Sequence, residues 1–97
     1  MEANLKSPEG TKRSRLEIFG DILSATKADM QSSGEGAVVT RVQDQTRTPY
    51  VRFKRYLEIM QELNLIQLLN GKIMMTPAGE ELLLDYGRIK TLLKRAS

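Results

Sequence analysis

Apolar residues recur every three or four positions after residue 13, and this spacing predicts a helix with one apolar face. The residues of that face are Leu16, Phe19, Ile22, Leu23 and Thr26. Ser14 and Glu17 have the spacing of a capping box, in which each side chain bonds the other's backbone at a helix N-terminus. We therefore expect the helix to start at Ser14 and to give way to a polar loop over residues 31–36.

A short strand and a short second helix are predicted next. Residues 37–39 are Ala-Val-Val, a segment too brief for a helix but suited to a small strand. Thr40 and Gln43 repeat the capping-box spacing. This pattern places a helix at residues 41–46.

A third helix follows after a very short turn. Thr48 precedes Pro49, and a threonine cap with proline at the first helical position predicts a helix over residues 49–63. Asn64 can adopt the left-handed conformation that ends a helix. With only Arg47 and Thr48 between the second and third helices, the pair forms a helix-turn-helix arrangement.

A β-hairpin and a last helix complete the chain. Residues 65–69 and 72–76 are expected to be strands, because Asn70-Gly71 between them is a strong signal for a two-residue hairpin turn. Thr76-Pro77 repeats the cap-then-proline pattern and starts a helix over residues 77–95. The order helix, short strand, helix, helix, β-hairpin, helix predicts an α+β fold of the winged helix-turn-helix type.

Length and composition narrow the class of protein. Ninety-seven residues provide one domain, expected over residues 13–97, while the polar, non-periodic residues 1–12 predict a flexible N-terminal arm. No apolar run is long enough for a membrane span or a secretory signal, which favours the cytoplasm. The chain has no cysteine and no histidine, which excludes zinc fingers, thiol nucleophiles and His-based triads. We expect no cofactor, no metal and no enzymatic activity.

The distribution of charge indicates a nucleic-acid partner, although the net charge of +3 is only mildly basic. On the predicted third helix, Phe53, Tyr56, Leu57, Met60 and Leu63 share one face, with Tyr50 at its margin. The opposite face is basic in its N-terminal half and acidic, with Glu58 and Glu62, in its C-terminal half. Cations at a helix start oppose the helix macrodipole but suit a helix that faces phosphates.

Candidate DNA contacts follow from this position, because the first residues of the second helix of a helix-turn-helix contact base edges. Arg52 and Arg55 are expected to contact bases or phosphates, and Val51 to lie near thymine methyls. Contacts to phosphates are expected from Lys54, Arg47 and Thr48, with Tyr50 as an edge contact and Lys72 as a hairpin-tip contact. About five phosphate contacts would give a slope of log affinity against log salt near −4.5.

The last helix suggests a homodimer. Spacings of four and three residues, typical of a heptad seam, separate Leu82, Tyr86, Ile89, Leu93 and Ala96. The second half of this helix is expected to project beyond so small a core, where a second copy could cover it. The alternative is a helix packed entirely within its own chain, because two heptads fall short of a confident coiled coil.

Several segments resemble the small archaeal winged-helix DNA-binding proteins. Residues 14–23 (SRLEIFGDIL) are similar to that family's opening helix, and residues 76–83 (TPAGEELL) to its TxxGxxFL signature. The segments at residues 13–21, 40–42, 56–57 and 65–66 agree in order and spacing. The resemblance implies a dimeric chromosomal or transcriptional regulator that binds double-stranded DNA and is associated with the nucleoid. The final helix is shorter than in the chromosomal members, and the loop at residues 31–36 is longer.

Other functions remain open at this point, because a fold does not determine a function. The main alternative is a winged helix that contacts proteins in the transcription or replication machinery, for which Glu58 and Glu62 are the relevant face. RNA binding by shape is a further possibility. An enzyme would need clustered titratable groups in a pocket, and the sequence contains no such pattern.

Overall fold

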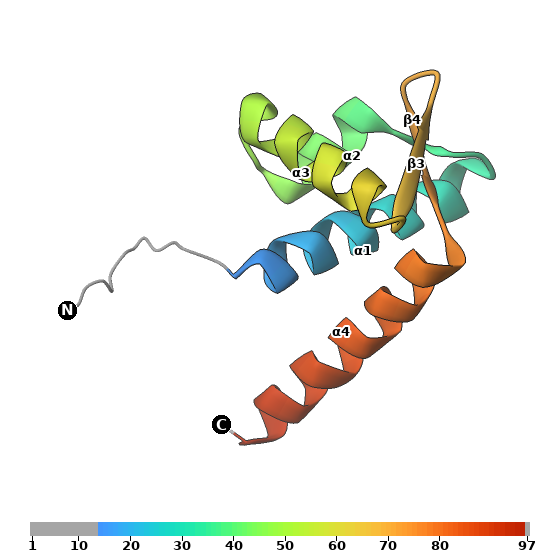
Figure 1. The fold of residues 1–97 in the computed structure, drawn as a ribbon. Helices are drawn as coiled ribbons and strands as arrows, with labels where there is room; N and C mark the ends of the chain where they lie inside the picture. The colour runs from blue at the N-terminus through green and yellow to red at the C-terminus, as the bar shows by residue number, and fades with distance from the viewer. Residues whose placement is uncertain (1–13, 97) are drawn as a thin grey trace.

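The computed structural model describes residues 14–96, which fold into four helices and a three-stranded sheet (Figure 1). The elements in chain order are α1 (Arg15–Ser33), β2 (Ala37–Val38), α2 (Val39–Thr46), α3 (Tyr50–Glu62), β3 (Ile66–Leu69), β4 (Lys72–Met75) and α4 (Pro77–Ala96). The predicted α+β order is confirmed. The predicted arm at residues 1–12 lies outside the described residues.

Helix α1 begins with the predicted capping box. The backbone N–H of Ser14 donates to Glu17 Oε1 at 2.8 Å, and the N–H of Glu17 donates to Ser14 Oγ at 3.2 Å. The helix is longer than expected, because it continues through Ser33 and ends at Gly34, whose N–H donates to the Met30 carbonyl. Residues 31–33 are therefore helical and the following loop is shorter than predicted.

Two of the predicted helix caps are wrong. Helix α2 begins at Val39, after an N-cap at Val38 without a side-chain bond, so Thr40 lies inside the helix. Helix α3 begins at Tyr50, after Pro49 as N-cap, and again has no side-chain cap. Thr48 is buried, and its hydroxyl donates to the Thr46 carbonyl at 3.4 Å. Both threonines match a local pattern, but neither side chain caps the helix that follows it.

The sheet has the strand order β2-β4-β3 and is antiparallel throughout. Ile73 in the central strand pairs with Ala37 on one side and with Leu68 on the other. Asn70 and Gly71 both have positive φ, 52° and 74°, which a tight two-residue hairpin requires. The predicted turn is confirmed, as is the left-handed Asn64 (φ 62°) after α3.

The core lies where α1, α2, α3 and the sheet meet. Its largest fully buried apolar side chains are Phe53, Ile22, Leu23, Met60, Ile66, Ile73 and Val42. The ring of Phe19 on α1 meets Tyr56 on α3 edge-on, with centroids 6.2 Å apart. Leu63 is 57% exposed, contrary to the predicted apolar face, because α3 ends at Glu62 and the chain turns away.

Helix α4 starts at the predicted threonine cap and packs on α1 along its first half only. Thr76 Oγ1 accepts from the N–H of Gly79 at 3.1 Å and donates to the Asn64 carbonyl at 2.6 Å. Further along α4, the ring of Tyr86 packs so closely on Gly20 that it leaves no room for a Cβ there. Figure 1 shows α4 then running away from the other elements, and its side chains over residues 87–95 are exposed.

Candidate nucleic-acid interface

A compact turn of three residues fixes the start of α3 relative to α2. Arg47 has a left-handed backbone (φ 55°) and donates its N–H to the Gln43 carbonyl at 2.9 Å. The Gln43 side chain donates in turn to the Thr48 carbonyl at 3.2 Å. Gln43, which the sequence marked as a cap partner, therefore ties α2 to the turn. Pro49 completes the turn, which is one residue longer than predicted.

Helix α3 has the two predicted faces. Phe53 and Met60 are fully buried and Leu57 nearly so, which anchors the helix on the core. On the opposite side Val51 is 82% exposed and Arg55 is exposed as well. An apolar side chain with this exposure has no role in the core. It lies on the same face as the arginine, where a ligand could contact both.

The first half of α3 and the turn before it present four cations. Arg47, Arg52 and Lys54 are exposed, and among the residues the structure describes none of them forms an ion pair. Arg55 lies 3.9 Å from Glu58 with both side chains largely exposed. An exposed ion pair of this length contributes little to stability and is easily broken by a ligand. All four guanidinium and ammonium groups are therefore available to an anionic ligand.

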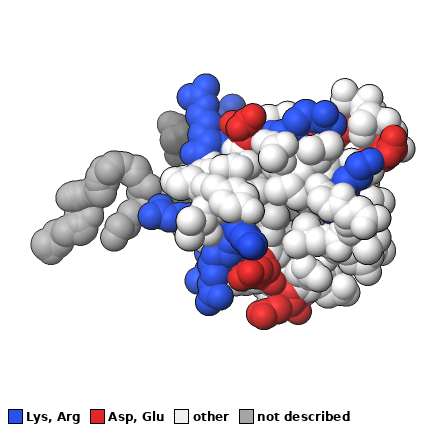
Figure 2. All heavy atoms as spheres, turned by 90° about the horizontal axis from the view of Figure 1, so that it is seen from above, with Lys and Arg blue, Asp and Glu red and all other residues white. Residues whose placement is uncertain are grey.

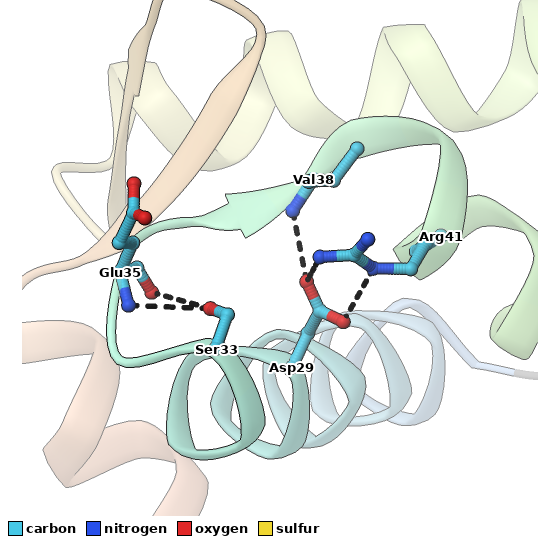
Figure 3. Close-up of polar contacts among 5 residues, drawn as sticks. All are labelled: Asp29, Ser33, Glu35, Val38 and Arg41. Atoms are coloured by element: carbon cyan, nitrogen blue, oxygen red, sulfur yellow. Dashed lines mark hydrogen bonds and ion pairs between the residues drawn. The ribbon is translucent and has the colours of Figure 1, made fainter.

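The cations on the neighbouring elements are paired instead. Arg41 on α2 donates two hydrogen bonds to Asp29 of α1, at 2.8 and 3.2 Å, and the N–H of Val38 donates to the same carboxylate (Figure 3). The bonds from Arg41 and Val38 lower the pKa of Asp29 below its ordinary value, against the opposing effect of burial. Asp29 thus accepts from the N–H of Val38, the residue just before α2, and links α1 to the start of that helix.

Lys72, the expected contact at the hairpin, is also paired. Its Nζ lies 2.6 Å from Glu35 Oε1, and this ammonium lowers the pKa of Glu35. Glu35 was not identified from the sequence, because 37 positions separate it from Lys72 and no local pattern links them. Thr48 is corrected too: its buried, bonded hydroxyl does not face solvent as a phosphate contact must. Tyr50 is 55% exposed at the start of α3, as its marginal position predicted.

Charge on the face formed by α2, α3 and the hairpin tip is mixed. Figure 2, which views this face from above, shows lysine and arginine side chains in separate groups around an uncharged centre, with acidic side chains beside them. No uniform basic field covers the face. Interaction with a polyanion therefore depends on which cations lack an acidic neighbour.

Comparison with known proteins agrees with this geometry. The family model described as "Winged helix-turn-helix" matches residues 12–94, most of the chain. This chain belongs to the winged helix-turn-helix family. A solved structure of Sso10a-2, a DNA-binding protein from Sulfolobus solfataricus, is similar with a TM-score of 0.67 and 20% identity, over 87% of this chain and 85% of that one. No curated protein matches. The archaeal winged-helix resemblance inferred from the sequence is thus confirmed at the level of the fold.

The expected dimer seam on α4 of this winged helix needs correction. Tyr86 is buried against α1, and its hydroxyl donates to Asp21 Oδ1 at 3.2 Å. Leu82 is half-buried and packs against the core. Both side chains therefore belong to the fold of a single chain. Ile89 and Leu93, 40% and 65% exposed, continue the same stripe beyond the domain.

A second apolar area lies elsewhere on α4. Leu84 and Leu92 are 58% and 62% exposed, and they border a shallow groove of about 680 Å³ that also contains Gly87 and Thr91. The second half of α4 thus exposes apolar side chains in two directions. Such a surface is more typical of a covered helix than of one in water.

The part of the chain that the structure describes contains neither a candidate metal centre nor a helix that could span a membrane. Within residues 14–96 no three Asp or Glu side chains are grouped so that they could hold a metal ion. None of the helices in that range combines the length and the apolar character that crossing a membrane requires.

Proposed function

We propose that this winged helix binds double-stranded DNA through α3 and acts by binding, not by catalysis. The observation that carries the proposal is the set of exposed cations without close acidic partners on α3 and its turn, while Arg41 and Lys72 nearby are neutralised. The N-terminal residues of this helix are the ones that enter the major groove in helix-turn-helix proteins. Sso10a-2, which shares the fold, is described as a DNA-binding protein.

Each exposed side chain of α3 has a proposed role. Arg52 and Arg55 contact base edges or phosphates, because a guanidinium can donate two bonds to guanine. Val51 contacts thymine methyl groups on the same face. Arg47 and Lys54 hold phosphates on either side, and Tyr50 contacts the backbone at the helix start.

The finer function proposed is that of a transcriptional regulator or chromosomal protein of archaeal type, located on the nucleoid. We further propose a homodimer that forms through the second half of α4. Ile89, Leu92 and Leu93 expose apolar surface there, and a second copy of the same helix is the partner that a heptad spacing favours. Two α3 helices related by a two-fold axis would then face two half-sites.

The experiment is a fluorescence-anisotropy titration of a labelled, mixed-sequence DNA duplex at several salt concentrations. If Arg47, Arg52, Lys54 and Arg55 each neutralise one phosphate, the slope of log affinity against log salt is about −3.6 per protomer, and each arginine that contacts a base in place of a phosphate makes it shallower by about 0.9. Arg52→Glu and Arg55→Glu should each weaken binding about tenfold or more. Arg15→Glu, an exposed position in the first turn of α1 with the same charge change, is the matched control and should remain within twofold of wild type.

Two results would overturn the proposal. If the wild type fails to bind duplex at low salt, a protein partner becomes the better hypothesis, with Glu58 and Glu62 at the C-terminal end of α3 as the surface to test. If Arg52→Glu and Arg55→Glu bind as Arg15→Glu does, DNA is contacted by another surface and α3 is not the recognition helix.

A further inference from the structure

Lys72 occupies the position on the hairpin from which a winged helix can extend a cation to DNA. It is the first residue of β4, directly after the Asn70-Gly71 turn. Its ammonium, however, is 2.6 Å from a carboxylate oxygen of Glu35, on the loop between α1 and β2. The side chains are 40% and 68% exposed, so the pair is at the surface where a ligand would meet it.

Both partners of this ion pair are held in place by the backbone around them. Ser33 Oγ accepts from the N–H of Glu35 at 3.2 Å and donates to its carbonyl at 3.3 Å, so the loop is fixed at the end of α1 (Figure 3). Lys72 pairs with Val38 in the sheet, and the Gly71 carbonyl beside it accepts from the N–H of Val39. The fold therefore fixes the two backbone positions from which the lysine and the carboxylate extend toward each other.

We propose that Glu35 withholds Lys72 from the DNA backbone, so that the hairpin adds no net phosphate contact and affinity depends on α3. This inference rests on the proposed function. A phosphate that approaches Lys72 must displace Glu35 and then remain near its negative charge. Arg47, Arg52 and Lys54 have no acidic partner among the described residues, so they impose no such cost.

This arrangement has a consequence for specificity. Phosphate contacts raise the affinity for every DNA sequence alike, whereas base contacts distinguish sequences. Because the hairpin lysine is neutralised, it adds no sequence-independent contribution to the binding free energy. Base contacts from α3 then form a larger share of the binding free energy. Glu35 is thus a residue that sets specificity without touching a base.

The test compares four proteins in the anisotropy titration: wild type, Glu35→Gln, Glu35→Gln/Lys72→Met, and Glu81→Gln as a control for net charge. Glu81 is an exposed carboxylate on α4 without an ion pair among the described residues. Glu35→Gln should bind duplex DNA three- to tenfold more tightly than wild type, with a slope steeper by about 0.9, near −4.5. The double variant should return to wild-type affinity and slope, and Glu81→Gln should match wild type.

Every other pattern of results contradicts the inference. If Glu35→Gln binds no more tightly than Glu81→Gln, the carboxylate does not withhold the lysine. If the double variant binds several-fold more weakly than wild type, Lys72 already contacts DNA in the native protein. Failure of the proposed DNA binding gives a different result from both of these, because the wild type itself would then show no salt-dependent binding. In that case the inference about Glu35 would be wrong as well.

Discussion

At the scale of single residues, Arg47 combines a backbone role with a proposed DNA contact, and the two can be separated. Its left-handed φ of 55° is unfavourable for a side chain with a Cβ by about 1–2 kcal/mol but open to glycine. Arg47→Gly should therefore keep or slightly raise the free energy of unfolding, measured in urea. It should weaken DNA binding about threefold or more through the lost phosphate contact.

The matched variant for this prediction is Arg47→Ala, which removes the same charge but keeps a Cβ in the left-handed conformation. Arg47→Ala should lose DNA affinity as Arg47→Gly does. Its free energy of unfolding should be lower than that of Arg47→Gly by up to about 1 kcal/mol. If Arg47→Gly binds DNA as tightly as wild type, the guanidinium makes no contact and Arg47 is only a turn residue.

Some local patterns in this sequence predict the observed caps and turns, and others do not. Ser14 with Glu17, the Asn70-Gly71 turn and the Thr76 cap were predicted because each depends on neighbours within four positions. Thr40 and Thr48 match the same kind of pattern and do not cap. The start of α2 is bonded instead through the N–H of Val38, which donates to Asp29, and no local pattern reveals that contact.

At the scale of elements, Asp29 joins α1, β2 and α2, so its ionisation should affect the stability of the helix-turn-helix. Its pKa is lowered in the folded protein by the bonds from Arg41 and Val38. A lowered pKa means that the stabilisation is complete above the ordinary value of 3.8 and is lost as the pH falls through the folded value. Asp29→Asn should lower the thermal unfolding midpoint at pH 7, and the difference from wild type should shrink below about pH 4.

Asp85→Asn is the control for this prediction, because Asp85 pairs with Arg88 on an exposed face of α4 at 3.4 Å. It should change the midpoint little at either pH. The opposite outcome is a difference in unfolding midpoint between wild type and Asp29→Asn that stays constant down to pH 3. It would show that the charge of Asp29 contributes nothing to stability and that the substitution acts only through altered packing or hydrogen-bond geometry.

The elements themselves were predictable, whereas the contacts that join them were not. Capping patterns, turn residues and β-branched or apolar spacing predicted the order of all seven elements, and helical periodicity predicted the buried face of α3 apart from Leu63, since each of these signals is local. The burial of Tyr86 depends on Gly20, which lies 66 positions earlier and leaves space for the ring. For the same reason the sequence indicated Arg52 and Lys54 as exposed cations but could not indicate that Lys72 is neutralised.

At the scale of the whole molecule, the open question is what covers the second half of α4. Ile89, Leu92 and Leu93 expose apolar surface where no other described part of the chain packs. We expect a homodimer, so sedimentation equilibrium at tens of micromolar should give about twice the chain mass of 11.0 kDa. Leu92→Glu/Leu93→Glu should give the monomer mass, because Leu93 lies on the seam stripe and Leu92 on the apolar area beside it, and a carboxylate covered by a second helix at either position would lose its hydration.

The control is Leu63→Glu/Leu69→Glu, which changes two leucines of similar exposure, 57% and 59%, outside α4 and should leave the dimer intact. A dimer that engages two half-sites also predicts that Leu92→Glu/Leu93→Glu binds a long duplex more weakly than wild type, although its α3 is unchanged. A wild type that sediments as a monomer would remove the dimer. DNA binding by α3 would then be the property of a single domain, and the salt slope of about −3.6 would be that of the whole protein.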